Sequence, residues 1–188
     1  MKITGGKAKG IFIKVAEKST VRPATDYLRQ AIFSSLGSFI DGAYFLDLFA
    51  GTGAYGLEAW SRGARAGVFV EKDRNCLSAI KLNIEAVAKS AEKISSDCKI
   101  IHGDVFKTSL PCENQFDLIF ADPPYEITSD ILPELLGLVS EWLKKSLASR
   151  LIIEVPGNLV APSHPDLVLL KKLGKDKRNS PAAFIWGR

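Results

Sequence analysis

Residues 47–56 read DLFAGTGAYG, and this glycine-rich stretch decides the expected fold. An apolar run at residues 44–49 leads into it, and a pattern typical of a short helix follows at residues 55–63. A strand, a tight glycine turn and a helix in this order are typical of a nucleotide-binding unit. Glu71 lies twenty residues after Gly51, at the expected end of the next strand. An acid at this spacing can hold the hydroxyl groups of a ribose.

On both sides of this unit, the chain alternates apolar runs with helical patterns. Strands are expected at residues 44–49, 66–73, 98–104, 116–122, 150–156, 167–174 and 182–187. Helices are expected at residues 22–37, 55–63, 75–91 and 131–147, and a small hairpin at residues 2–4 and 10–15. The alternation predicts an α/β fold with a doubly wound, mostly parallel seven-stranded sheet. The last two strands have no helix between them, so they predict an antiparallel C-terminal pair.

The composition suits one globular domain over residues 1–188, with residues 1–40 as an N-terminal extension of hairpin and helix. The chain has 188 residues, 46% of them hydrophobic, which is enough for a substantial core. Its three cysteines lack CxxC spacing, which argues against a disulfide framework or a zinc site. The first ten residues, MKITGGKAKG, contain no apolar signal region, and no run approaches transmembrane length. We expect a cytoplasmic monomer without metal or membrane partner.

Positive charge is concentrated at the two ends of the chain. Residues 1–30 hold seven Lys and Arg against two acids, and residues 171–188 hold six against one. Residues 31–170 hold twelve against eighteen. Basic ends around an acidic middle suggest a polyanion that is bound by the periphery. The candidates for RNA contact are Lys7, Lys9, Lys175, Lys177 and Arg178.

Acidic residues lie near the ends of three successive expected strands and indicate the kind of nucleotide. Asp47 lies just before the glycines, where a carboxylate would repel a pyrophosphate in a dry crevice. S-adenosylmethionine carries no phosphate, and its ammonium group could donate to Asp47. Glu71 could accept from both ribose hydroxyls, and Asp104 could accept from the adenine amino group. This pattern favours S-adenosylmethionine as the cofactor and methyl transfer as the reaction.

A fourth acid begins the segment DPPY, residues 122–125, after the fourth expected strand. A residue before proline is held outside the α region, and prolines offer no N–H, so this backbone is stiff and free of donors. An exocyclic amine could donate one hydrogen to Asp122 and the other to the carbonyl oxygen of Pro123. Pro124 keeps the turn rigid, and Tyr125 offers a flat face for stacking a base. These four residues are the predicted catalytic set.

With DLFAGTGAYGLEAWSRGA and ADPPY in place, the chain resembles the RsmD family over nearly its whole length. The resemblance implies a Rossmann-like class I methyltransferase fold and transfer of a methyl group to the N2 amine of a guanine in 16S ribosomal RNA, within the 30S particle. It also implies that Thr25, with Arg22, closes over the methionine end of the cofactor. The complete set of residues expected to bind the cofactor is Arg22, Thr25, Asp47, Phe49, Ala50, Gly51, Thr52, Gly53, Glu71, Lys72, Asp104, Val105 and Asp122.

Three other functions remain open from the residues alone. The DPPY tetrad also occurs in DNA adenine-N6 methyltransferases. A non-catalytic ribosome assembly factor could retain the same fold. An NAD-dependent oxidoreductase would use a similar glycine loop, but the position of Asp47 argues against a pyrophosphate there.

Overall fold

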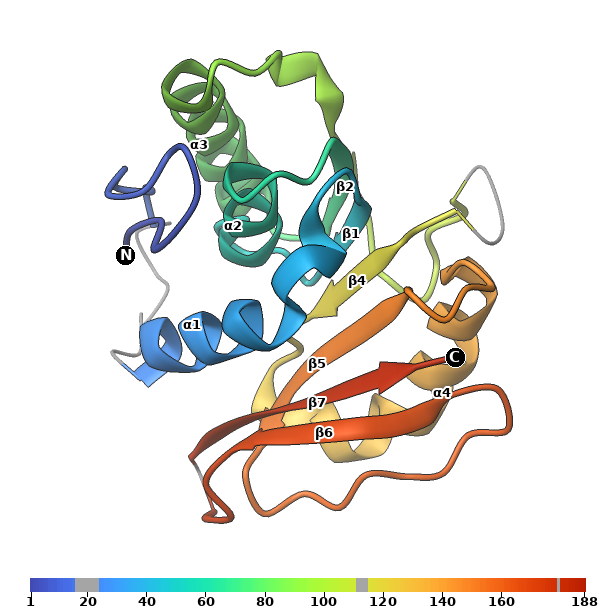
Figure 1. Cartoon of the computed structure of the whole chain (residues 1–188). Helices are drawn as coiled ribbons and strands as arrows, with labels where there is room; N and C mark the ends of the chain where they lie inside the picture. Colours follow the sequence, from blue (N-terminus) through green and yellow to red (C-terminus); the bar gives the residue numbers. More distant parts are fainter. Residues whose placement is uncertain (16–23, 111–114, 179) are drawn as a thin grey trace.

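The computed structural model describes residues 1–15, 24–110, 115–178 and 180–188 (Figure 1). Within these ranges, seven strands form one sheet in the order β3-β2-β1-β4-β5-β7-β6. Their bounds are β1 Tyr44–Leu48, β2 Ala66–Glu71, β3 Cys98–His102, β4 Leu118–Ala121, β5 Arg150–Pro156, β6 Val168–Gly174 and β7 Pro181–Gly187. Strands β1 to β5 pair in parallel, whereas β7 is antiparallel to both β5 and β6. The expected sheet, including its antiparallel C-terminal pair, is confirmed.

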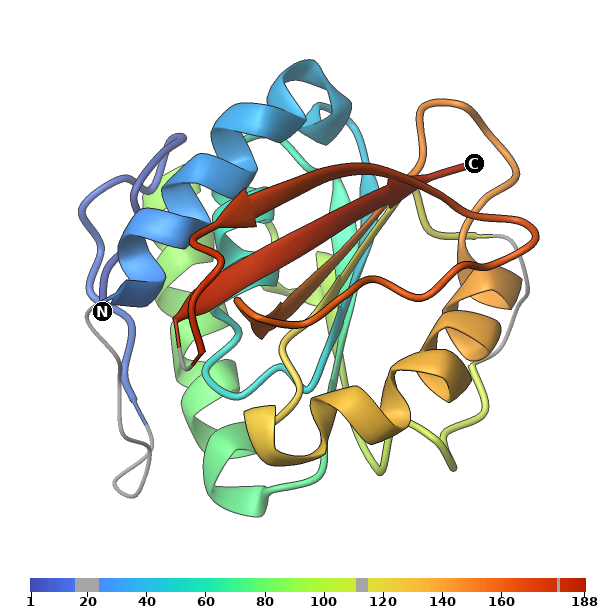
Figure 2. The ribbon, with the colours of Figure 1, turned by 90° about the horizontal axis from the view of Figure 1, so that it is seen from below.

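In the part of the chain that the structure describes, four α-helices cover the two faces of the sheet unequally (Figure 2). They are α1 Ala24–Leu36, α2 Ala54–Ser61, α3 Arg74–Ala91 and α4 Tyr125–Trp142, and two short 3-10 helices, η1 Gly37–Ile40 and η2 Ser95–Asp97, complete the elements. One buried apolar cluster joins α1, α2 and α3 to one face of the sheet, and a second joins α4 to the other. Alternation along the strands produces both clusters: Phe45 enters the first and Leu46 the second. None of the described helices is long and apolar enough to span a membrane.

Helix α4 differs from the expected range of 131–147 at both ends. It begins at Tyr125, directly after Pro124, because the residues before 131 include exposed polar side chains such as Glu126 and Asp130, which an apolar pattern does not mark. It ends at Trp142, because Leu143 is extended and bridges Phe116. The tetrad tyrosine is therefore the first residue of a helix. It does not belong to a loop.

The N-terminal segment is reduced from the expected hairpin to one antiparallel bridge, Lys2 with Phe12. It packs against the end of α2 instead of extending a sheet. The backbone N–H of Lys7 donates to the carbonyl oxygen of Ser61, at 2.8 Å, and Thr4 donates to the carboxylate of Glu58 through both its N–H and its hydroxyl. Lys7 thus lies toward the edge of the sheet where strands begin, whereas Lys14 lies beside Asn83 of α3.

The order of the strands in the sheet indicates which edge is expected to bind a ligand. The chain moves outward from β1 to β3 and then returns to place β4 beside β1. In open α/β sheets, ligands bind outside the carboxyl ends of strands at such a reversal. Residues 49–53 follow β1 and Asp122 follows β4, so the glycine loop and the tetrad lie at this one edge.

Candidate active site

A cavity of about 310 Å³ lies where the ends of β1, β2, β3 and β4 meet. It brings together seven of the residues expected at the site: Phe49, Glu71, Lys72, Asp104, Val105, Asp122 and Pro124. Apolar walls come from residues without a predicted role, namely Phe106 and, on α4, Ile127 and Ile131. The cavity therefore joins two carboxylates of the expected cofactor site to the first residue of the tetrad.

Glu71 organises the turn after β1. It is 8% exposed, and its carboxylate accepts from the backbone N–H of Gly51 at 2.7 Å and from those of Lys72 and Asp73 at 2.8 Å. The N–H of Gly53 donates to Ala50 within the same turn. These donors are used inside the protein, an arrangement unlike that of a loop that cradles phosphate oxygens.

Phe49 adopts a left-handed backbone conformation, with φ of 55°. This conformation costs a residue with a Cβ roughly 1–2 kcal/mol. Its ring lines the cavity and packs 6.3 Å from that of Phe106. Backbone strain that the surrounding structure maintains is typical of a ligand site.

Asp47 is buried beneath the glycine loop and does not line the cavity. Its Oδ2 accepts from the N–H of Gly56 in α2, at 2.8 Å. Burial, with a smaller contribution from nearby Glu71, raises the pKa of Asp47 to about 8, although the Gly56 bond opposes this shift. The raised pKa favours the neutral form of Asp47, which weakens charge repulsion from this group as a reason to exclude a pyrophosphate. A better reason to exclude a pyrophosphate is that the N–H groups of the loop already donate to acceptors within the protein.

The tetrad turns sharply from β4 into α4. Asp122 and Tyr125 are half-buried, Pro123 is buried and Pro124 is exposed. The carbonyl oxygen of Pro124 accepts from the hydroxyl of Thr128 at 2.9 Å, whereas that of Pro123 lies 3.5 Å from the same hydroxyl, too far for a strong bond. The Pro123 carbonyl thus makes at most a weak contact with Thr128, as its predicted role as an acceptor requires.

The other expected residues are placed around the cavity without lining it. Ala50, Gly51, Thr52 and Gly53 form the turn itself, and Pro123 and Tyr125 flank the lining residues of the tetrad. Arg22 lies outside the described residues, and Thr25 lies in the first turn of α1 with its side chain outside the description. The predicted closure over the cofactor by these two residues stays a prediction.

Two further residues support the site, and neither belongs to the set that the sequence predicts. Asn83 of α3 is buried and donates to the carbonyl oxygens of Thr52 and Lys14. Glu154 of β5 is 3% exposed and accepts from the hydroxyls of Tyr55 and Tyr125. A signal for Glu154 was present, because it is another acid near the end of an apolar strand.

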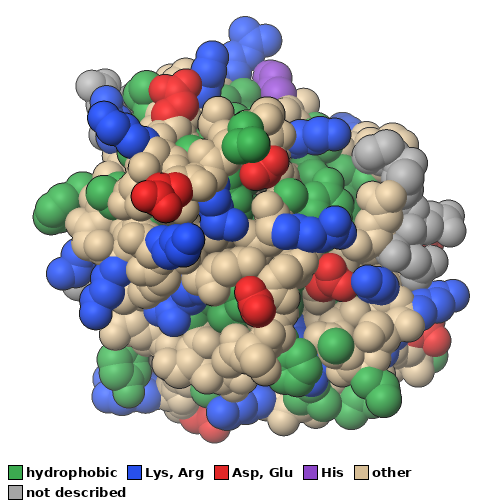
Figure 3. Space-filling model, turned by 45° about the horizontal axis from the view of Figure 1, so that its top comes forward, with side chains coloured by type: hydrophobic (Ala, Val, Ile, Leu, Met, Phe, Trp, Pro, Cys, Tyr) green, Lys and Arg blue, Asp and Glu red, His purple; other side chains and the backbone are tan. Residues whose placement is uncertain are grey.

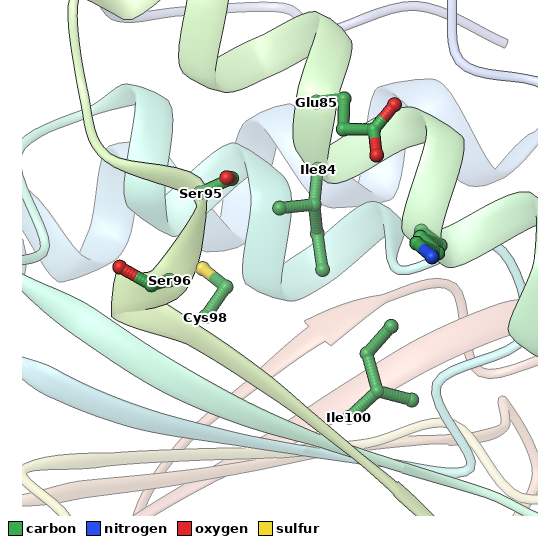
Figure 4. Close-up of a pocket in the computed structure, with 7 residues that line it drawn as sticks. Ile84, Glu85, Ser95, Ser96, Cys98 and Ile100 are labelled. Atoms are coloured by element: carbon green, nitrogen blue, oxygen red, sulfur yellow. The ribbon is translucent and has the colours of Figure 1, made fainter.

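A second hollow, of about 290 Å³, lies between α3 and the beginning of β3 (Figure 4). Its lining includes Ile84 and Glu85 from α3 and Cys98 from β3. Burial raises the pKa of Cys98 to about 12, so the thiol is inert near neutral pH. Because this hollow lies at the amino end of a strand, it is remote from the strand ends that carry the site.

Charged side chains are mixed over the face shown in Figure 3, where Lys and Arg alternate with acids instead of forming one stripe. This face therefore gives no reason to place a polyanion on it. Among the residues that the structure describes, no cluster of three or more His, Cys, Asp or Glu side chains is arranged to hold a metal ion.

Residues 1–177 match the protein family described as "Conserved hypothetical protein 95". The chain belongs to this family. The match confirms the resemblance to the RsmD family, because the relatives include proteins named ribosomal RNA small subunit methyltransferase D. The one in Haemophilus influenzae is 28% identical over 178 residues, 93% of this chain and 89% of the relative. YlbH of Bacillus subtilis, whose name assigns it provisionally as an rRNA methyltransferase, is 31% identical over 93% of this chain and 88% of its own length.

Solved structures of similar fold confirm the class I methyltransferase architecture. The yhhF protein of Escherichia coli, provisionally assigned as a methyltransferase, superposes with a TM-score of 0.79 at 23% identity, over 100% of this chain and 97% of its own. SMU.776 of Streptococcus mutans was solved with S-adenosylhomocysteine. It has a TM-score of 0.63 at 16% identity, over 82% of this chain and 48% of its own.

Proposed function

We propose that this protein transfers a methyl group from S-adenosylmethionine to the exocyclic N2 amine of a guanine in small-subunit (16S) ribosomal RNA, within the 30S particle. One observation carries the proposal: Asp122 and Pro124 line the same cavity as Glu71 and Asp104. The names of the relatives support an rRNA substrate and a methyltransferase reaction. The choice of guanine over adenine rests on the resemblance to the RsmD family.

The donor set of the cavity suits an adenosyl group without phosphate. Glu71 at the end of β2 would accept from the ribose hydroxyls, and Asp104 beyond β3 would accept from the adenine amino group. The rings of Phe49 and Phe106, together with Ile127, supply apolar surface for the adenine. A volume of about 310 Å³ falls within the range of small-molecule sites, about 300–1,000 Å³.

When bound, S-adenosylmethionine supplies an electrophilic methyl group on a sulfonium, which keeps the electron pair of the broken C–S bond. An aryl amine is a weak nucleophile because its lone pair is delocalised into the ring. Asp122 and the Pro123 carbonyl oxygen would accept its two hydrogens and favour a more pyramidal nitrogen, whose lone pair is less delocalised and points at the methyl group. Asp122 would also accept the proton that the methylated nitrogen must lose. The rate then comes from positioning and electrostatics.

The test is methyl transfer to small subunits purified from a strain that lacks this enzyme, with mapping of the methylated nucleotide. We expect Asp122→Ala to lower the rate by about 100-fold or more, because one of the two acceptors is lost. Asp130→Ala is the matched control, since Asp130 is an exposed acid of α4 outside the cavity. Equal rates for Asp122→Ala and the native protein would contradict the proposed positioning of the amine.

The same assay separates the alternatives. Labelled cofactor incubated with duplex DNA would be consumed by a DNA adenine-N6 methyltransferase. Tight, salt-sensitive binding to 30S particles without turnover would indicate a non-catalytic assembly factor. Transfer to 30S particles, with the label on a guanine N2, is the result that we expect.

Three of the basic residues expected to contact RNA lie on the turn between β6 and β7. The N–H of Gly157, just beyond β5, donates to the carbonyl oxygen of Ser180, so this turn lies at the edge that carries the tetrad. Lys175, Lys177 and Arg178 are exposed there, whereas Lys7 lies beside the end of α2. We expect the triple Gln variant at 175, 177 and 178 to weaken RNA binding and to reduce its salt dependence by about one unit of slope for each lost phosphate contact. Lys7→Gln with Lys9→Gln is the comparison variant.

A further inference from the structure

Glu154 joins two tyrosines that lie far apart in the sequence. Its Oε1 accepts from the hydroxyl of Tyr125 at 2.9 Å, and its Oε2 accepts from that of Tyr55 at 2.5 Å. Tyr125 is the last residue of the tetrad and the first of α4, and Tyr55 is the second residue of α2, just beyond the glycine loop. One buried carboxylate therefore connects the two halves of the candidate site.

The Tyr55 end of this connection is rigid. The ring of Tyr55 stacks on that of Phe120, with centroids 5.7 Å apart and planes 16° apart, and it also stacks on Phe33 at 6.5 Å. Burial, followed by the negative charges of Glu154 and Asp122, raises the pKa of Tyr55 well above its usual value. The hydroxyl therefore keeps its proton and acts as a donor. Glu154 is held by a side chain that the core itself fixes.

The Tyr125 end lies closer to solvent. Tyr125 is half-buried at the first position of α4. A half-buried ring can rotate about its side-chain torsions unless a second point is held. Its hydroxyl provides that point, because the bond to Glu154 fixes the far end of the ring while the backbone fixes the near end.

We propose that Glu154 is a positioning residue that sets the ring plane of Tyr125 through its hydroxyl. This inference rests on the proposed function, in which Tyr125 stacks against the target base. A ring that is already oriented loses less conformational freedom when the base arrives, so more of the stacking energy contributes to orienting the amine. A chain of contacts thus leads from the core to the base: Phe120 packs on Tyr55, Tyr55 bonds Glu154, and Glu154 bonds Tyr125.

The kinetic test is a double-mutant cycle on methyl transfer to 30S particles. Tyr125→Phe removes only the donor hydroxyl, and Glu154→Gln keeps the size of the side chain but loses one acceptor oxygen. We expect each change to lower kcat by about ten- to a hundredfold, while the Kd for S-adenosylhomocysteine stays unchanged. If Glu154 acts through Tyr125, the double variant is no slower than Tyr125→Phe alone. Effects that multiply would overturn the inference.

A structural measurement tests, without an activity assay, whether Glu154 holds the ring of Tyr125. The chain has four tyrosines, so 3-fluorotyrosine labelling gives four fluorine resonances that single Tyr→Phe variants assign. We expect Glu154→Leu to shift and broaden the Tyr125 resonance and to leave that of Tyr27, which is 79% exposed, in place. An unchanged Tyr125 resonance would contradict the inference that Glu154 orients this ring. If Glu154→Leu fails to fold, Glu154→Gln serves in the same measurement.

The two experiments fail in different ways. If the native protein transfers no methyl group to RNA or DNA, the proposed function is wrong, and the catalytic part of the inference with it. If the native protein is active and the Glu154 and Tyr125 effects multiply, only the inference is wrong. Tyr27→Phe is the control for tyrosine substitution and should leave kcat unchanged.

Discussion

The side-chain amide of Asn83 lies between Thr52 and Lys14 and holds both backbones. Its Nδ2 donates to the carbonyl oxygens of Thr52 and Lys14, each at 3.0 Å, and its Oδ1 accepts from the N–H of Lys14 at 2.7 Å. One residue of α3 therefore ties the glycine loop to the N-terminal segment. The chain continues from this segment toward Arg22 and Thr25, so Asn83 sets where that connection begins.

Replacing Asn83 by Ala should loosen the glycine loop. The change leaves the N–H of Lys14 and two carbonyl oxygens without their partner, and a lost buried hydrogen-bond partner costs about 1–3 kcal/mol. We expect a lower free energy of unfolding in urea and weaker binding of S-adenosylhomocysteine by calorimetry. Asn75→Ala is the control, because Asn75 is exposed on the same helix. Unchanged binding by Asn83→Ala would show that the loop keeps its shape without this amide.

Gly56 should tolerate no Cβ. An ideal Cβ there would lie 2.5 Å from Phe69 Cε1 and 2.6 Å from Phe45 Cε2, two rings of the core. Overpacking of this kind costs about 1–3 kcal/mol. We expect Gly56→Ala to lower the free energy of unfolding, measured by urea denaturation, by about that amount.

Gly137 provides the matched comparison. It lies within α4 and has open space where a Cβ would be. Alanine favours a helix by about 1 kcal/mol relative to glycine, so Gly137→Ala should raise the free energy of unfolding. Equal destabilisation by the two alanines would show that the close contact at Gly56 is relieved by movement of the rings.

Asp47 should make stability fall as the pH rises. Its pKa is raised from 3.8 in the unfolded reference to about 8 in the folded protein. Between these values the folded state binds a proton that the unfolded state has lost, so the free energy of unfolding decreases with pH, by at most about 1.4 kcal/mol per unit for one proton. Asp47→Asn keeps an oxygen for the N–H of Gly56 and removes this titration. Stability curves of the two proteins should diverge between pH 5 and pH 8; parallel curves would contradict the raised pKa.

Glu58 should be essential for stability but not for chemistry. Its carboxylate is fully buried and pairs with Arg62 at 2.8 Å and with Arg29 at 3.5 Å, while also accepting from Thr4. Removing one member of a buried ion pair costs about 3–5 kcal/mol. We expect Glu58→Ala to lower the melting temperature markedly by calorimetry and to expose residues 1–15 to limited proteolysis. Glu134→Ala, an exposed acid of α4, should do neither.

Much of this fold is encoded in local patterns. Short apolar runs, separated by helical patterns, predict the seven strands, and the first glycine turn after residues 44–49 marks where the ligand edge begins. The acids of that edge were also predictable, because Glu71, Asp104 and Asp122 each lie at or just beyond the end of an apolar strand. Parallel strands carry such residues to one edge whatever the details of packing.

Other features depend on distances that no local pattern contains. The bond from Tyr55 to Glu154 joins residues 99 positions apart, and the pKa of Asp47 follows from its complete burial. Helix α4 begins six residues earlier than its apolar pattern suggested, because exposed polar residues such as Glu126 and Asp130 belong to it. The sequence by itself determined the order of the strands along the chain and the kinds of residue at their ends. Only the tertiary structure decided which of those residues share a hydrogen bond or lose contact with water, since both depend on packing between segments that are distant in the chain.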